Sequence, residues 1–289
     1  MNRRLSDFSG SWYPATAEDC KREIDEFLTE PVEAPGLPEE RFGGVVPHAG
    51  WVFSGRIACR VLHALESEPP PGVWVLFGMH LPPGARPVIL ATGSWETPFG
   101  ALPVAEDLAA KLIGRFPFEV ETPRTARPDN TIELQLPFVN HLFGNVRILP
   151  IGAPPDPISL EIARAVVETA VEDGVRVKII GSTDLTHYGP NYGMTVMGRG
   201  KGAVKWVREE NDRRLIEALL ALDGRRAISE ALTHHNACCA GAAAAAAEAA
   251  KAMGANKASL LEYATSYDRS PGDSFVGYAG IIFYREASE

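Results

Sequence analysis

Short apolar runs alternate along the chain with segments in which apolar positions recur at helical spacing. The short runs predict buried strands, and they lie at residues 43–46, 73–79, 88–92, 147–151, 176–180, 260–264 and 275–284. The helical spacing predicts helices over residues 17–28, 56–66, 106–116, 132–143, 160–171, 204–222 and 225–232. This alternation is typical of the α/β class, so we expect a mixed, largely parallel sheet flanked by helices. Because no linker or internal repeat interrupts the pattern, we expect a single domain over residues 1–289.

Three of the predicted strands are followed by side chains that can ionise or bind a metal. His48 follows the first strand and His80 follows the second, while Asp184 and His187 follow the strand that begins near residue 176. Open α/β sheets place their ligand sites at the carboxyl ends of the strands. We therefore expect these side chains to belong to one site.

An alanine tract follows two adjacent cysteines late in the chain. Cys238 and Cys239 precede residues 240–253, which are mostly alanine and therefore predict a helix. The amino end of a helix lowers the pKa of a thiol and favours the thiolate. Two imidazoles and one thiolate would form a three-ligand site suited to Fe(II), copper or zinc. The residues alone leave the alternative open, namely structural histidines and a buried thiol.

Asp184 and His187 form a second candidate pair. The carboxylate can fix the tautomer of the imidazole, and the imidazole can then transfer protons. The alternative is that Asp184 caps a helix and that His187 lies on the surface. The glycine-rich segment at residues 189–202 predicts a flexible loop beside this pair, which could serve as a lid.

The composition narrows the class of protein. A formal net charge of −9 argues against a general binder of nucleic acid or of anionic membranes. Four cysteines in 289 residues do not indicate a disulfide framework. The chain has no apolar run of about 18 residues, and its amino terminus lacks the apolar core of a signal peptide. We therefore expect a cytoplasmic protein.

Several motifs together resemble one known family. They are Val46-Pro47-His48-Ala49-Gly50-Trp51, Gly78-Met79-His80, Glu133-Leu134-Gln135-Leu136-Pro137-Phe138, Ser182-Thr183-Asp184-Leu185-Thr186-His187-Tyr188, Asn236-Ala237-Cys238 and Val276-Gly277-Tyr278-Ala279. With these motifs the chain resembles the MEMO family, whose fold is similar to that of class III extradiol dioxygenases of the protocatechuate 4,5-dioxygenase type.

The resemblance implies a site and an activity. It implies that His48, His80 and Cys238 bind iron or copper, and that His187 acts as acid and base with Asp184 beside it. Cys238 is preferred to Cys239 because the family has glycine after its cysteine. The implied reaction is O₂-dependent ring opening of a small aromatic, catechol-type substrate on Fe(II). The alternative implied by the family is a metal-binding, redox-linked adaptor or chaperone that works with AMMECR-type and radical-SAM proteins. A homo-oligomer is compatible with either.

The chain departs from the family pattern at two places. Asp129-Asn130-Thr131 stands where the family usually has Glu-His-Ser, so an imidazole is missing there, and Thr265-Ser266-Tyr267 stands where the family has Thr-Ser-Gly. We expect an aromatic wall around the pocket, which would specialise it for a substrate of its own. The residues predicted to form it are Trp51, Phe53, Trp95, Tyr188 and Tyr267.

Overall fold

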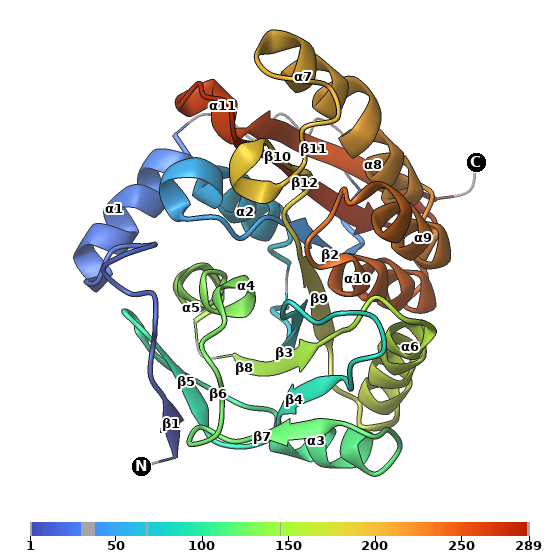
Figure 1. Cartoon of the computed structure of the whole chain (residues 1–289). Helices are drawn as coiled ribbons and strands as arrows, with labels where there is room; N and C mark the ends of the chain where they lie inside the picture. The colour runs from blue at the N-terminus through green and yellow to red at the C-terminus, as the bar shows by residue number, and fades with distance from the viewer. Residues whose placement is uncertain (1, 30–37, 68, 145, 288–289) are drawn as a thin grey trace.

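A nine-stranded sheet forms the centre of the computed structural model, which describes residues 2–29, 38–67, 69–144 and 146–287 (Figure 1). The strands follow the order β10-β12-β2-β9-β3-β8-β4-β7, and β11 pairs with β12. Their bounds are β2 Arg41–Val46, β3 Val73–Gly78, β4 Val88–Leu90, β7 Glu119–Glu121, β8 Arg147–Gly152, β9 Val177–Ser182, β10 His187–Tyr188, β11 Lys257–Thr265 and β12 Phe275–Tyr284. A second sheet has the order β1-β5-β6, with bounds Arg3–Arg4, Ser94–Thr97 and Gly100–Pro103.

The four central strands, β2, β9, β3 and β8, run parallel to one another. Antiparallel strands follow on both sides, because β12 pairs antiparallel with β2 and β4 pairs antiparallel with β8. The predicted mixed sheet is therefore confirmed, and its parallel part coincides with the strands that carry His48, His80 and Asp184. Since parallel strands end at the same edge of a sheet, these residues are brought to one place.

Helices cover both faces of this sheet (Figure 1). Helices α3, α6, α8, α9 and α10 pack on one face, and α1, α2, α4 and α5 pack on the other. The bounds are α1 Ala17–Phe27, α2 Trp51–Ala64, α3 Glu106–Ile113, α4 Asn130–Glu133, α5 Leu136–Phe143, α6 Pro157–Glu172, α7 Lys201–Trp206, α8 Asp212–Leu220, α9 Gly224–His234, α10 Ala240–Ala252 and α11 Ser266–Arg269. Among the described residues, no helix has both the length and the apolar character that crossing a membrane requires.

Side chains of a single strand alternate between two hydrophobic cores. Val75 and Phe77 of β3 join the core under α6 and α10, whereas Trp74 and Leu76 join the core under α2 and α5. This is the period of two expected for a strand. Because both faces are buried, the strand reads in the sequence as an uninterrupted apolar run.

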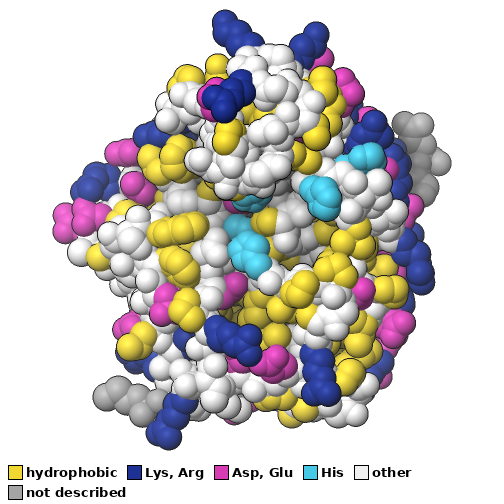
Figure 2. Space-filling view, viewed as in Figure 1, with side chains coloured by type: hydrophobic (Ala, Val, Ile, Leu, Met, Phe, Trp, Pro, Cys, Tyr) yellow, Lys and Arg dark blue, Asp and Glu magenta, His cyan; other side chains and the backbone are white. Residues whose placement is uncertain are grey.

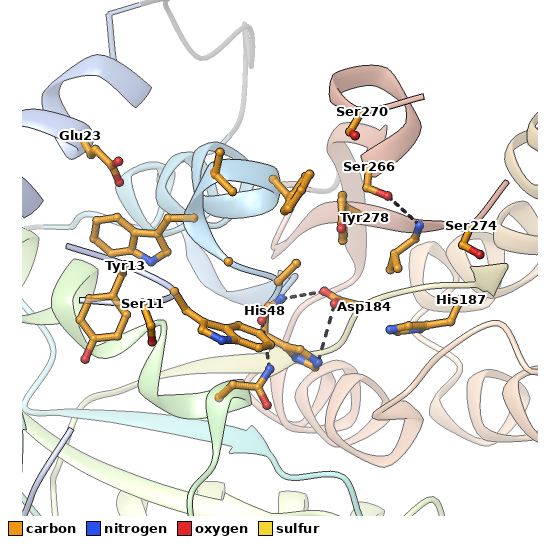
Figure 3. A pocket seen from close by; sticks show the side chains of 18 of the residues that line it. Ser11, Tyr13, Glu23, His48, Asp184, His187, Ser266, Ser270, Ser274 and Tyr278 are labelled. Atoms are coloured by element: carbon orange, nitrogen blue, oxygen red, sulfur yellow. Dashed lines mark hydrogen bonds and ion pairs between the residues drawn. The ribbon is translucent and has the colours of Figure 1, made fainter. Parts of the chain in front are cut away.

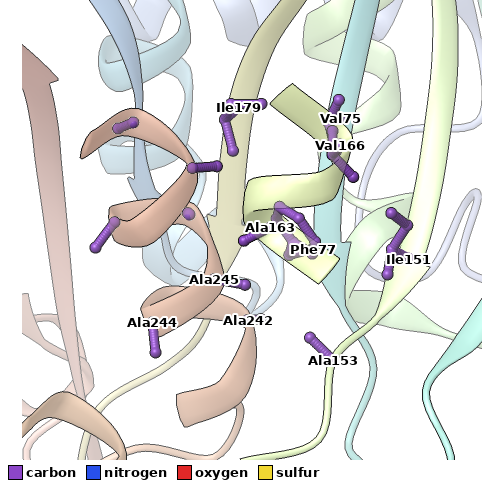
Figure 4. Close-up of a cluster of buried hydrophobic side chains, with 14 of the residues drawn as sticks. Val75, Phe77, Ile151, Ala153, Ala163, Val166, Ile179, Ala242, Ala244 and Ala245 are labelled. Atoms are coloured by element: carbon purple, nitrogen blue, oxygen red, sulfur yellow. The ribbon is translucent and has the colours of Figure 1, made fainter. Parts of the chain in front are cut away.

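The alanine tract forms α10, which is buried against the sheet. Ala242 to Ala247 have no exposed surface, and the helix lies beside α6 and β9 (Figure 4). Gly181 of β9 is the point of closest approach, because a Cβ atom added there would lie 2.5 Å from the Ala242 carbonyl oxygen and 2.8 Å from the Ala246 Cβ. Small side chains on both elements thus let the helix backbone approach the strand, and this approach sets the position of the residues just before α10.

Three predicted segments differ from the observed ones. Helix α2 begins at Trp51 and not near residue 56, so Trp51 and Phe53 belong to its first turn. The predicted helix 204–222 is interrupted by a π-helical turn at Val207–Asn211. Residues 94–103, where the apolar pattern predicts no strand, contain β5 and β6 of the second sheet.

The contact between Gly181 and α10 predicts a specific loss of stability. Gly181→Ala forces the helix away from β9, and we expect the free energy of unfolding to fall by about 2 kcal/mol, as for other overpacked cores. Gly202→Ala is the matched control, because a Cβ there meets no atom within 4 Å and the residue lies in α7. Chemical denaturation measures both variants. Equal unfolding midpoints for the two variants would contradict the proposed packing constraint.

Candidate metal centre

Three strand ends place His48, His80 and Asp184 at one edge of the sheet. Strands β2, β9 and β3 are neighbours and end at Val46, Ser182 and Gly78. After β3 the backbone turns sharply, because Met79 adopts a positive φ of 66° and its amide N–H donates to Thr131 Oγ1. A positive φ is uncommon for a residue with a long side chain. This turn directs His80 into the cavity above the strand ends.

Cys238 reaches the same edge from the other side of the sequence. It lies between α9 and α10, and its neighbour Cys239 is the residue that caps the amino end of α10. The Cys238 amide donates to the Asp184 carbonyl, and the Asp184 amide donates to the Cys238 sulfur at 3.3 Å. Two reciprocal hydrogen bonds therefore join the loop before α10 to the end of β9. The predicted position of the two cysteines at the start of a helix is confirmed.

The side chains predicted to bind metal converge. One nitrogen or sulfur atom each of His48, His80, Cys238 and Cys239 lies within 4.8 Å of all the others. The Cys238 Sγ atom is 3.2 Å from His48 Nε2, and the two imidazole rings meet edge to face with centroids 5.0 Å apart. His48 is buried, whereas His80 is exposed to the cavity. Figure 2 shows histidine side chains in the hollow near the middle of this face.

Backbone and side-chain contacts fix the orientation of His48. Its amide N–H donates to Asp184 Oδ1 at 2.7 Å, and its Nδ1 atom lies 3.0 Å from Ser182 Oγ. The Asn130 side-chain amide donates to the His48 carbonyl. With Nδ1 engaged by the serine, Nε2 is the ring nitrogen that faces Cys238. Such outer contacts fix the ring direction and tautomer of metal-binding histidines.

Charges at this site stabilise a thiolate opposite an imidazolium. Burial raises the pKa of Cys238, but hydrogen bonds from Cys239, His48 and His80 and the charge of His48 outweigh it, so the pKa lies well below its usual value. Burial lowers the pKa of His48, yet Cys238 and Asp184 raise it overall to about 9. Burial and the hydrogen bond to Cys238 raise the pKa of Cys239 well above its usual value. Cys239 therefore stays a thiol and acts as a donor.

The geometry and chemistry of these donors fit a metal ion. Nitrogen and sulfur ligands lie about 2.0 to 2.3 Å from zinc, so adjacent ligands of a tetrahedral site are separated by about 3.3 to 3.8 Å. The distance of 3.2 Å between Cys238 Sγ and His48 Nε2 lies close to the short end of this range. Two imidazoles and a thiolate suit Fe(II), copper or zinc. The cavity adjoins the site, so further coordination positions would face it.

His187 lines the same cavity as this cluster, and a backbone carbonyl sets the tautomer of its imidazole ring. The Nδ1 atom lies 3.1 Å from the Leu185 carbonyl oxygen. A carbonyl only accepts, so Nδ1 of the neutral ring carries the proton, and Nε2 is an acceptor without a hydrogen-bond partner among the described residues. Asp184, expected to fix this tautomer, makes no hydrogen bond to the ring among the described residues. Asp184 instead accepts a hydrogen bond from the His48 amide. Its observed partner is therefore His48 and not the predicted His187.

A cavity of about 780 Å³ extends from these side chains (Figure 3). His48, His80, Asp184 and His187 all line it. Of the five aromatic residues predicted to form its wall, Trp51 and Phe53 line it, although the Trp51 indole is 2% exposed and stacks on Phe138.

The other three aromatic residues do not line the cavity, so the structure corrects this part of the predicted wall. Trp95 lies in the second sheet, where it is fully buried beneath the guanidinium group of Arg4. Tyr188 is buried against Phe275, and its hydroxyl donates to the Gly198 carbonyl. Tyr267 packs edge-on against Phe275 as well. Each of these rings packs against other side chains of the protein. From the sequence alone, an aromatic residue that packs in this way cannot be distinguished from one that lines a pocket.

Several lining residues were not predicted from the sequence. They include Trp12, Tyr13, Glu23, Asn130, Tyr192, Ser266, Ser270, Ser274 and Tyr278. Asn130 occupies the position where the resemblance indicated a missing imidazole, and this position does face the cavity. Tyr192 packs edge-on against His187, with ring centroids 5.0 Å apart. Tyr192 lies in the short helical turn Pro190–Tyr192, within the glycine-rich segment that was predicted to be a loop beside His187. That prediction was the one sequence feature that pointed to Tyr192.

A buried polar network lies behind His187 and Cys238. Asp212 accepts hydrogen bonds from the Thr186 amide and hydroxyl and from the Tyr263 hydroxyl. Asn211 donates to the Thr186 hydroxyl, and Asn236 donates to the Asn211 carbonyl. Burial is the main cause that raises the pKa of Asp212, to about 6. Both loops of the site are thus anchored to the π-helical turn and the start of α8.

Comparison with known proteins identifies relatives over nearly the whole chain. The family model described as Memo-like protein matches residues 4–282. A MEMO1 family protein of Methanosarcina acetivorans is 35% identical over 290 residues, covering 98% of this chain and 99% of that protein. One from Pyrobaculum aerophilum is 32% identical over 297 residues, covering 99% of this chain and 100% of that protein.

A solved structure shares the fold at low sequence identity. The crystal structure of the uncharacterised protein JW3007 from Escherichia coli K12 aligns with a TM-score of 0.55 and 9% identity. The alignment covers 83% of this chain and 99% of that chain. At this identity the likeness concerns the fold alone.

We expect substitutions of the two adjacent cysteines to affect metal binding differently. We expect Cys238→Ser to weaken Co(II) binding by more than about 100-fold and to abolish the thiolate-to-cobalt charge-transfer absorption, because the thiolate ligand is lost. Cys239→Ser is the matched control, because the serine O–H replaces the thiol S–H as the donor to Cys238 and should leave both properties close to wild type. Equal absorption in wild type and Cys238→Ser would refute Cys238 as ligand.

The raised pKa of His48 predicts that metal binding depends on pH. Below about pH 9 the free protein holds a proton on His48, and a metal must displace this proton. Affinity should therefore rise about tenfold per pH unit toward pH 9, with release of about one proton. Chelator competition between about pH 6 and pH 8.5 measures the slope. Calorimetry in buffers of different ionisation enthalpy counts the protons, and a pH-independent affinity would contradict the ion pair.

Proposed function

The chain belongs to the Memo-like protein family, and from this premise and the geometry of its cavity we propose that it is an Fe(II)-dependent, dioxygenase-like enzyme. The proposed substrate is a small aromatic of the catechol type, and the proposed reaction is ring opening with O₂. The observation that carries the proposal is that three convergent donors and His187 line or adjoin one cavity of about 780 Å³, and that the Nε2 atom of His187 has no hydrogen-bond partner within the described part of the chain. Copper is the alternative metal.

In this proposal His48, His80 and Cys238 hold the metal. The Fe(II) ion would supply open coordination positions for the catechol oxygens and for O₂, together with the electron density that activates O₂. The protein supplies the thiolate already deprotonated, because Cys239 and His48 stabilise its charge. The two reciprocal hydrogen bonds between Cys238 and Asp184 hold the sulfur in place before any ligand arrives.

His187 is proposed to move protons. Its Nδ1–H is engaged by the Leu185 carbonyl, so Nε2 accepts a proton from a catechol hydroxyl and returns it to the opened product. Tyr192 packs against the ring and limits its rotation. Asp184 lines the same cavity, and its Oδ1 atom accepts a hydrogen bond from the His48 amide, so in this proposal it holds His48 in place beside the reacting groups.

The second candidate is a metal-binding, redox-linked adaptor or chaperone that works with AMMECR-type and radical-SAM partners. An adaptor would be supported by an exposed apolar surface without a cavity of substrate size. The exposed side chains of Val52 and Phe53 lie at the cavity and so serve either candidate. The size of the cavity and its direct connection to the donor cluster favour the enzyme.

The proposal predicts oxygen consumption that depends on His187. After anaerobic loading with Fe(II), wild type should consume O₂ with at least one member of a panel of catechols. His187→Ala should keep its iron and lower kcat by about 100-fold or more, because the acid and base is lost. His63→Ala is the control, since His63 lies on α2 and pairs with Glu66. If fully loaded wild type consumes no O₂ with any catechol, the adaptor replaces the enzyme.

A further inference from the structure

The charge distribution of the cavity carries information about the substrate. Its lining includes the carboxylates Glu23 and Asp184 and no lysine or arginine among the described residues. The chain as a whole has a net charge of −9. The imidazolium of His48 lies at the metal end and is already paired with the Cys238 thiolate. A carboxylate elsewhere in the cavity would therefore have no lysine or arginine of the lining to pair with, and an unpaired buried charge is costly. The lining away from the metal end thus disfavours anionic groups.

Glu23 is the carboxylate distant from the metal donors. It lies on α1, on the opposite side of the cavity from His187 (Figure 3). Its Oε2 atom is buried and has no hydrogen-bond partner among the described residues. Burial is the main cause that raises the pKa of Glu23, and Glu26 adds to it, while Arg22 and Arg269 act against it. Neither arginine lines the cavity, and Arg22 pairs with Asp19. The carboxylate lacks a counterion on the cavity side.

Aromatic rings line the same cavity. Trp12 is 41% exposed and Phe53 is 43% exposed, so both present surface to an entering molecule. The Trp12 carbonyl accepts a hydrogen bond from the Trp51 amide, which fixes the turn that carries Trp12 against the start of α2. Aromatic faces attract cations, most strongly where a carboxylate adds its charge. An aromatic surface with an unpaired carboxylate is the chemistry that recognises an ammonium group.

We propose that the substrate carries a positively charged amine, bound near Glu23 and the rings of Trp12 and Phe53, at the end of the cavity away from His187. This inference rests on the proposed function, because it treats the metal-bound end as the place of the catechol ring. The substrate class is then an aromatic amine with vicinal hydroxyls and no carboxylate. Asn130, at the position where the family usually has an imidazole, is consistent with this class, since it adds no positive charge to the lining.

The test compares ligands that differ only in charge. Metal-free protein is titrated with 2-phenylethylamine, 2-phenylethanol and phenylacetate, with binding followed by calorimetry. Wild type should bind the amine about fivefold to tenfold more tightly than the alcohol, and phenylacetate most weakly, as expected for one partly exposed charge contact with aromatic support. Equal affinity for the amine and the alcohol, or no saturable binding of the amine, would overturn the proposal.

Two variants assign the preference to Glu23. Glu23→Gln keeps the shape of the side chain and should remove the preference for the amine over the alcohol. Glu26→Gln removes the same charge from an exposed position of the same helix and should retain the preference. A preference that survives in Glu23→Gln, or that disappears equally in both variants, would show that net charge and not a local contact selects the ligand.

The Fe(II)-loaded protein separates this inference from the proposed function. Oxygen consumption is compared for dopamine, 3,4-dihydroxyphenylethanol and 3,4-dihydroxyphenylacetate. Turnover of all three with equal kcat/KM would leave the enzyme standing and refute the amine site. Preferential binding of 2-phenylethylamine without any oxygen consumption would support the amine site and refute the dioxygenase.

Discussion

The contact between the Cys238 sulfur and the His48 imidazole, 3.2 Å long, joins parts of the chain that are 190 positions apart. It depends on two independent placements. The parallel pairing of β2 with β9 brings His48 beside Asp184, and the hydrogen bonds between Asp184 and Cys238 bring the cysteine to the same strand end. A buried thiolate needs a nearby positive charge. His48 supplies that charge in the free protein, and a metal would supply it when bound.

The packing of α10 determines where Cys238 can lie. Its alanines and Gly181 let the helix approach β9 closely, so the helix start reaches the strand ends. Larger side chains would move the helix outward and withdraw the cysteine from the histidines. Asp212 accepts a hydrogen bond from the Thr186 amide and so holds the loop that follows β9. This contact requires a buried carboxylate, and burial raises the pKa of Asp212. The site is therefore supported by close apolar packing on one side and by a polar network on the other.

The sequence predicted the parts of the site that depend on periodicity. Apolar runs that end at His48 and His80 and an alanine tract that begins after Cys239 locate three side chains without any structure. It could not predict the partner of His187, because that partner is a backbone carbonyl whose position depends on the loop conformation. It could not place Trp95, because the strand Arg3–Arg4 that pairs with β5 is too short to show a period. Glu23 was also missed, since a carboxylate on an amphipathic helix usually faces solvent.

The two ends of the cavity differ in how their charges are compensated. At the metal end the negative charge of Cys238 is stabilised by neighbouring donors and by His48. At the other end Glu23 has an oxygen without a hydrogen-bond partner among the described residues, and it lines the cavity together with aromatic residues. An elongated molecule with an electron-rich ring at one end and a positive charge at the other would match both ends of the cavity. The fold alone does not determine this selectivity, because the metal donors lie at the strand ends and before α10, whereas Glu23 and Trp12 come from α1 and the turn before it. The metal donors and the walls of the cavity can therefore change independently, which allows one scaffold to keep its chemistry while its substrate changes.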